Sequence, residues 1–239
     1  MPTQNVDNNL SNSKNYTMYQ MGGISYIIVA FAILFSIIAF FIWPFKPGNV
    51  PIEDIFLLLQ NDRLGGLISL DLSMLIIIPI NVIPMVVLYY ILKQVDEFYA
   101  LLALIFGLIG VALLIPTRPL IELVDLSNQF AVTNSETIRS RLLTEGDLLL
   151  RQFNGTAWFC QSVFFLISGV INGILMLRAT TFRRITAIMN IAVNLVGLGF
   201  FIPIVGLILL FLNTIGTIIV YFFVAADFLN AAKTTGCKS

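Results

Sequence analysis

Residues 185–226 read ITAIMNIAVNLVGLGFFIPIVGLILLFLNTIGTIIVYFFVAA, an apolar run without a single charged residue. A single helix of this length would be about 63 Å long, roughly twice the thickness of a bilayer's hydrocarbon core. Gly199, Pro203 and Gly206 interrupt the run near its middle and favour a turn there. The run therefore predicts two antiparallel transmembrane spans, with a re-entrant hairpin as the alternative.

Four further apolar segments are long enough to cross a bilayer. The first, residues 24–45, contains no charge and ends beside two prolines and a lysine, as helices do at the membrane interface. The six expected spans cover residues 24–45, 66–92, 98–115, 156–177, 185–201 and 204–226. Composition agrees, since 58% of the residues are hydrophobic and 11% are charged, against about a quarter charged in soluble domains. The sequence predicts an all-α, polytopic membrane helix bundle.

The spans define the domain organisation. Residues 1–21 are polar and rich in Asn and Ser, which predicts a disordered N-terminal tail. Residues 22–232 form the six-span domain, and residues 233–239 form the C-terminal tail. Residues 118–154 are the one sizeable segment expected outside the membrane between spans.

This segment contains a predicted amphipathic helix. Thr133-Asn134-Ser135 followed by Glu136 is typical of a helix start, with a polar cap and an acid in the first turn. Ile138, Leu142, Leu149 and Phe153 then fall near one face. We expect the helix to lie on the membrane or to cap the bundle, either as a simple connector or as a lid.

Basic residues predict the orientation. The connector before the fifth span holds Arg178, Arg183 and Arg184 without an acid, and with six spans it lies on the same side as both termini. The excess of basic residues in short cytoplasmic loops therefore predicts cytoplasmic termini in the cell (plasma) membrane and an extracytosolic segment 118–154.

Several kinds of chemistry are excluded by composition. The chain has no histidine, which removes histidine-ligated metals, Ser-His-Asp catalysis and histidine proton relays. Two cysteines, Cys160 and Cys237, cannot form a four-cysteine metal site. A net charge of zero offers no field for nucleic acid. We expect no cofactor, no metal site and no nucleic-acid partner, and we predict no catalytic residue.

The polar residues within the spans are mostly amides. The candidate ligand-binding residues are Asp71, Asn81, Asn172, Asn190, Asn194 and Asn213. They could line a cavity for an amphipathic ligand, or they could form hydrogen bonds between helices, worth about 0.6 kcal/mol each. Asp71 could face a cavity or the interface, because residues 72–92 alone are long enough to span.

Asn81 has the most unusual setting, Pro79-Ile80-Asn81-Val82-Ile83-Pro84. Each proline removes an amide donor and crowds a carbonyl one turn earlier. A broken helix at membrane depth usually lines protein or a water-filled cavity. We expect Asn81 to donate to a freed carbonyl or to a ligand.

Two other sequence patterns leave alternatives open. Gly169 and Gly173 are four residues apart and allow two helices to approach closely, within the chain or between two copies. Glu122 and Asp125, close to Arg118, could be a carboxylate pair for acid–base chemistry or a solvated face with a local ion pair.

Five short segments resemble an uncharacterised family of prokaryotic membrane proteins, domain of unknown function 4386. They are MGGISY (21–26), LYYILK (88–93), YALLA (99–103), GILMLR (173–178) and FRR (182–184). The family tends to have a proline before that first arginine, where this chain has Phe182. The resemblance would cover residues 21–232 and implies a multi-span bacterial or archaeal membrane protein, but no activity and no site residues.

Three function classes follow. The first is non-enzymatic binding or transport of a lipid or small amphipathic ligand in an amide-lined cavity. The second is a structural or regulatory membrane component that acts through protein partners or as a homo-oligomer. The third is a lipid-modifying enzyme using Asp71 or the pair Glu122 and Asp125, which the missing histidine and motifs make the weakest.

Overall fold

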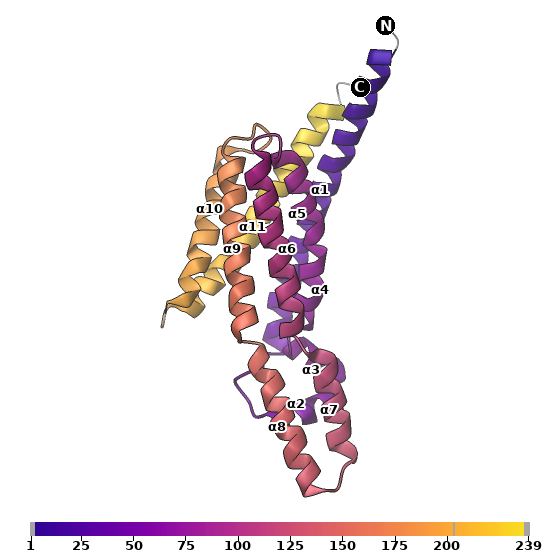
Figure 1. Ribbon diagram of the computed structural model, residues 1–239, viewed down its shortest axis with the longest axis vertical. Helices are drawn as coiled ribbons and strands as arrows, with labels where there is room; N and C mark the ends of the chain where they lie inside the picture. Colours follow the sequence, from indigo (N-terminus) through magenta and orange to yellow (C-terminus); the bar gives the residue numbers. More distant parts are fainter. Residues whose placement is uncertain (1–2, 203, 237–239) are drawn as a thin grey trace. The chain divides into compact units, whose positions relative to one another are not determined.

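The computed structural model describes residues 3–202 and 204–236, and these residues contain helices but no strand (Figure 1). The helices are α1 (Thr3–Ile42), α2 (Ile52–Asn61), α3 (Arg63–Ser69), α4 (Leu72–Ile80), α5 (Val82–Leu92), α6 (Glu97–Leu114), α7 (Leu120–Val132), α8 (Glu136–Gln152), α9 (Thr156–Met176), α10 (Arg184–Leu198) and α11 (Gly206–Gly236), with short 3-10 helices η1 (Ile115–Thr117) and η2 (Gly199–Phe201). Six helical segments are long and apolar enough to cross a membrane. The prediction of an all-α, six-span bundle is confirmed.

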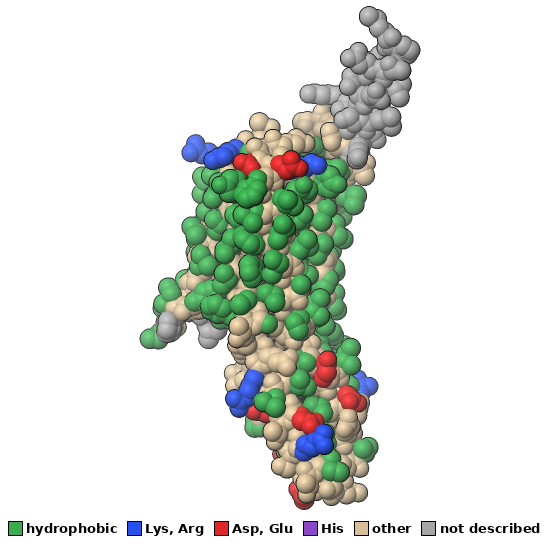
Figure 2. All heavy atoms as spheres, viewed as in Figure 1, with side chains coloured by type: hydrophobic (Ala, Val, Ile, Leu, Met, Phe, Trp, Pro, Cys, Tyr) green, Lys and Arg blue, Asp and Glu red, His purple; other side chains and the backbone are tan. Residues whose placement is uncertain are grey.

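The outer surface of the spans is hydrophobic. Figure 2 shows hydrophobic side chains covering much of it. On α1, Phe35 is 64% exposed and Phe41 is 80% exposed. Such a surface is unfavourable in water and suits a lipid environment, where the solvent is as apolar as the side chains.

Two spans begin differently from the prediction. The helix α1 starts at Thr3, inside the segment predicted to be a disordered tail, and the part of it that can cross a membrane is Asn15–Ile42, against the predicted 24–45. The second span starts at Leu72 rather than Gly66, since Leu70 and Asp71 separate α3 from α4. Asp71 has a φ of 71°, in the left-handed region that ends a helix.

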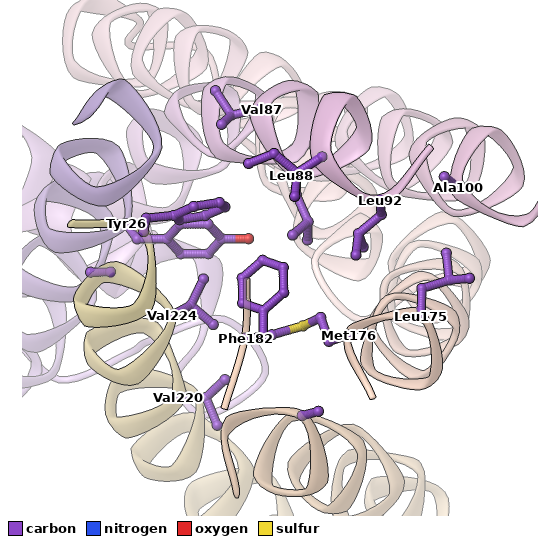
Figure 3. Close-up of a cluster of buried hydrophobic side chains, with 14 residues drawn as sticks. Tyr26, Val87, Leu88, Leu92, Ala100, Leu175, Met176, Phe182, Val220 and Val224 are labelled. Atoms are coloured by element: carbon purple, nitrogen blue, oxygen red, sulfur yellow. The ribbon is translucent and has the colours of Figure 1, made fainter. Parts of the chain in front are cut away.

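The chain forms two compact units. Unit 1 comprises residues 1–31, 80–108 and 163–239, and unit 2 comprises residues 32–79 and 109–162. In the core of unit 1, Leu88, Phe182 and Val224 point toward one another from α5, the α9–α10 connector and α11 (Figure 3). Tyr26 of α1 stacks on Phe228 of α11, with ring centroids 5.8 Å apart.

Unit 2 has a core of its own. Its buried side chains come from α2, α7 and α8 and from adjoining residues: Ile55, Phe56, Leu59, Leu70, Leu120, Leu123, Phe130, Leu142, Leu150 and Phe153. Residues 118–154 include nine charged residues, too many for the interior of a bilayer. We call α2, α7 and α8 the charged module.

The predicted start of α8 is confirmed, but its predicted face is only partly right. The helix begins at Glu136 after Ser135, as expected. Leu142 is buried, whereas Ile138 is 49% exposed and Leu150 takes the buried place expected for Leu149. The buried face therefore lies slightly around the helix from the predicted one.

Gly146 explains why α8 packs so closely on α2. A Cβ atom at this position would lie 2.6 Å from a side-chain carbon of Ile52 and 2.8 Å from one of Phe56. Only glycine fits at that separation. A residue that weakens α8 as an isolated helix thus permits its packing in the charged module.

Candidate functional site

Asn81 lies between α4 and α5, at the break that Pro79 and Pro84 predict. Its side chain is buried, and its Nδ2 donates a hydrogen bond to the Tyr221 hydroxyl of α11 at 3.1 Å. The Tyr221 ring meets the Tyr26 ring edge-on, with centroids 5.0 Å apart. The Asn81 amide therefore joins the broken span to α11, and its partner is a side-chain hydroxyl rather than a freed backbone carbonyl.

Three other predicted site residues form a second group in unit 1. Asn190 of α10 donates to the Gly169 carbonyl of α9 at 2.8 Å, and Asn213 of α11 donates to the Val193 carbonyl of α10 at 2.8 Å. Asn194 donates to the Asn190 carbonyl, one turn earlier in its own helix, at 2.7 Å. The Asn190 bond joins α10 to α9, and the Asn213 bond joins α11 to α10.

The predicted close approach at Gly169 and Gly173 occurs within the chain. A Cβ atom at Gly169 would overlap the Asn194 amide, and one at Gly173 would lie 2.5 Å from a side-chain carbon of Ile191. Both glycines thus face α10. This contact is where the Asn190 bond to Gly169 forms.

Two amides of α9 are not used in this way. Asn172 is half-buried in unit 1, and Gln161 is buried in unit 2. Over the part of the chain that the structure describes, neither side chain has a hydrogen-bond partner. Both amides therefore remain able to bind something else.

Asp71 belongs to unit 2, where it pairs with Arg118. The Arg118 Nε and Nη2 atoms each lie 2.9 Å from Asp71 Oδ2, and both side chains are at most 6% exposed. Arg118 Nη1 also donates to Thr117 Oγ1 at 2.9 Å and to the Phe153 carbonyl at 3.3 Å. The guanidinium thus connects the start of α4, the end of α6 and the end of α8.

Electrostatics explain why the buried Arg118 side chain is surrounded by an acid and several hydrogen-bond acceptors. A guanidinium stays charged when buried, so it needs a counter-charge and several acceptors. Burial raises the pKa of the Asp71 carboxyl, and Arg118 opposes that rise. Asp71 Oδ1 is buried and has no hydrogen-bond partner among the described residues. Asp71 is therefore a buried ion-pair partner rather than a solvated interfacial acid.

The acids near Arg118 in sequence are not its partners. Glu122 and Asp125 are exposed on α7, and Asp125 accepts a hydrogen bond from Gln129 at 2.9 Å. The solvated face is confirmed, but the local ion pair with Arg118 is wrong, because Arg118 turns toward Asp71.

A second buried acid was missed as a site. Asp227 of α11 is 3% exposed and accepts two hydrogen bonds from Arg183, from the backbone N–H at 3.1 Å and from Nε at 2.5 Å. The pair fixes the start of α10 to α11. The sequence did contain a signal for this pair. Asp227 lies at the end of the sixth span, on the same side of the membrane as the arginine-rich connector before the fifth span.

The fold and these contacts define a multi-pass helical membrane protein with a charged helical module between its spans. Within the described residues, no group of three or more acidic or cysteine side chains could hold a metal ion. Comparison of the chain with protein-family models, curated proteins and solved structures finds no match in any of the three. The resemblance to domain of unknown function 4386 stays a prediction.

Proposed function

We propose that this chain is a non-catalytic component of a prokaryotic plasma membrane that acts through protein partners binding the charged module. The observation that carries the proposal is the module's own buried core, formed by α2, α7 and α8. Joining two spans takes only a few residues. The ten buried apolar residues come from two connectors, one before the second span and one after the third, which pack on each other and are therefore more than simple links.

The surface of the module also favours a protein partner. Val132 is 80% exposed and Ile138 is 49% exposed, on either side of the α7–α8 turn. They lie close in sequence to the exposed acid Glu136. Apolar side chains beside charged ones are typical of protein interfaces, where an apolar centre is surrounded by a polar rim.

The span amides support the same function indirectly. Asn81, Asn190 and Asn213 each use their amide on another helix. Such bonds are the ordinary means of holding membrane helices together. The residues expected to line a ligand cavity are thereby largely engaged, which weakens the ligand-binding function.

The proposed orientation places both termini in the cytoplasm and the module outside. Arg178, Arg183 and Arg184 support it, since they share a side with the termini in a six-span chain. Residues 46–71 and 118–154, on the opposite side, hold nine acidic and six basic residues, a net charge of −3. A partner of the module would therefore have a basic or neutral contact surface.

Photo-crosslinking in the native membrane tests this function. A photoreactive amino acid at Val132 or Ile138 should capture one defined protein, either another chain or a second copy of this one. The same amino acid at Phe35, on the lipid-facing surface of α1, is the control and should capture lipid. Capture of nothing, or of lipid, from both module positions would contradict the proposal.

Binding of an amphipathic ligand is the second candidate, and the unpartnered amides of α9 favour it. If it is correct, Asn172→Leu should remove a bound lipid-like molecule while leaving thermal stability unchanged. Native mass spectrometry of the two proteins in the same detergent would show the difference.

A further inference from the structure

The turn between α10 and α11 contains no polar side chain. Asn194 and Asn213 bound a stretch, residues 195–212, in which every side chain is apolar. Turns in water are normally rich in polar residues such as Asn, Asp and Ser. The connector between α1 and α2, for comparison, holds Lys46 and Asn49.

The described side chains of this turn are strongly exposed. Ile202 is 53% exposed, Val205 is 40% exposed and Ile204 is 98% exposed. Figure 2 shows hydrophobic side chains at this end of α10, at the lower left of the picture. We call Phe201, Ile202 and residues 204–206 the hairpin tip. Something apolar must cover it, because apolar surface of this extent is unfavourable in water.

Backbone hydrogen bonds within and beside the tip satisfy several of its polar groups. Ile202 N–H donates to the Gly199 carbonyl at 3.0 Å, and the Ile202 carbonyl accepts from Gly206 N–H at 2.9 Å. The Val205 carbonyl accepts from Leu209 N–H at 3.0 Å. Internally satisfied backbone groups are what a turn needs where no water is present.

Helix length places the tip at a definite depth. We take the Arg183–Asp227 pair, at the other end of the hairpin, as the membrane boundary, because charged residues are excluded from the hydrocarbon core. From Arg184, α10 and η2 extend over 15 and 3 residues, about 28 Å in total. The hydrocarbon core is ~30 Å thick, and tilting shortens the reach further. The hairpin therefore ends at the far edge of the hydrocarbon core.

From these observations we infer that the hairpin tip lies within the bilayer, in contact with lipid acyl chains at the extracytosolic boundary. The hairpin reaches this boundary without emerging into water. This goes beyond the proposed function, because it assigns a lipid contact to unit 1 independently of any partner of the charged module.

Spin labelling of the reconstituted full-length protein tests the inference. Cys160→Ala and Cys237→Ser provide the background, and the label is attached at Ile204→Cys. Phe35→Cys is the lipid control, and Asn134→Cys, on the α7–α8 turn, is the water control. Power saturation then measures how often the label collides with oxygen, which dissolves in lipid, and with a water-soluble nickel chelate.

The label at residue 204 should resemble the label at residue 35, with high oxygen accessibility. Its nickel accessibility should be about tenfold or more below that of residue 134, because polar solutes are excluded from the hydrocarbon core. Nickel accessibility equal to that of residue 134 would overturn the inference, since the tip would then be in water. Low accessibility to both reagents would also overturn it, since protein rather than lipid would cover the tip.

Discussion

At the residue scale, Arg118 shows how a buried charge is accommodated. Its guanidinium contacts Asp71, Thr117 and the Phe153 carbonyl, and almost no solvent. A buried pair adds little net stability compared with apolar residues of the same shape, but losing one partner leaves an uncompensated charge. The pair therefore matters mainly for fixing the ends of α4, α6 and α8 in one arrangement.

Asp71→Asn should lower the free energy of unfolding by about 3–5 kcal/mol, because Arg118 would remain buried without its counter-charge. Asp147→Asn is the matched control. Its ion pair with Arg151 is exposed, and such pairs are worth at most about 1 kcal/mol. Unfolding by SDS titration in mixed micelles measures both. Equal effects of the two changes would mean that the Asp71 pair is solvated.

Asp71→Gly separates charge from backbone strain. The φ of Asp71 is 71°, and glycine adopts such a value without strain. The change would therefore stabilise the protein if conformation alone mattered at this position. The same SDS titration should instead show destabilisation close to that of Asp71→Asn.

Asn81 and Tyr221 should be coupled as an ordinary interhelical hydrogen bond. A double-mutant cycle of Asn81→Leu and Tyr221→Phe should give a coupling energy of about 0.6 kcal/mol, the mean for such bonds in membranes. The SDS titration used for Asp71 supplies the four values. A coupling energy of zero would show that Asn81 acts elsewhere, for instance on a ligand.

At the element scale, the helices of the spans were predictable and their partners were not. Long uncharged runs give spans directly, because the bilayer demands a fixed apolar length. The choice between Tyr221 and a freed carbonyl as the partner of Asn81 depended on which helix lies opposite, which one sequence does not contain.

The helices outside the spans were harder to predict. α2 was missed, although Glu53 and Asp54 in its first turn and buried Ile55, Phe56 and Leu59 are a legible amphipathic pattern. The helix α2 was not predicted because it is short and lies close in sequence to the second span. The pair of Asp71 with Arg118, 47 residues apart, had no local signal at all.

Close packing of α9 on α10 depends on Gly169. Gly169→Ala should lower the free energy of unfolding by about 1–3 kcal/mol, because the added methyl group would overlap the Asn194 amide. Gly155→Ala is the milder comparison, since an added Cβ would lie 3.3 Å from the Arg151 carbonyl oxygen, a contact that a shift of a few tenths of an ångström would relieve. The SDS titration measures both. Equal stability of the two variants would show that α9 and α10 are not in close contact there.

At the scale of the whole molecule, the two units differ in the contacts that stabilise them. Unit 1 is held together by amide bonds between helices and by an aromatic core. Unit 2 holds the charged module and its buried ion pair. We propose that protein partners bind unit 2.

The orientation can be tested in intact cells. A membrane-impermeant maleimide should label Asn134→Cys from outside, because the module is proposed to be extracytosolic. The same reagent should label Cys237 only after the membrane is opened, since both termini are proposed to be cytoplasmic. The reverse pattern would place the module in the cytoplasm.

Native mass spectrometry of the mildly extracted protein tests the central claim most directly, namely that the chain acts through protein contacts and not through a ligand held among its spans. The account predicts an assembly with a second copy or another protein, without a stoichiometric small molecule after detergent exchange. A single chain that retains one amphipathic molecule, and loses it on Asn81→Leu or Asn172→Leu, would contradict it.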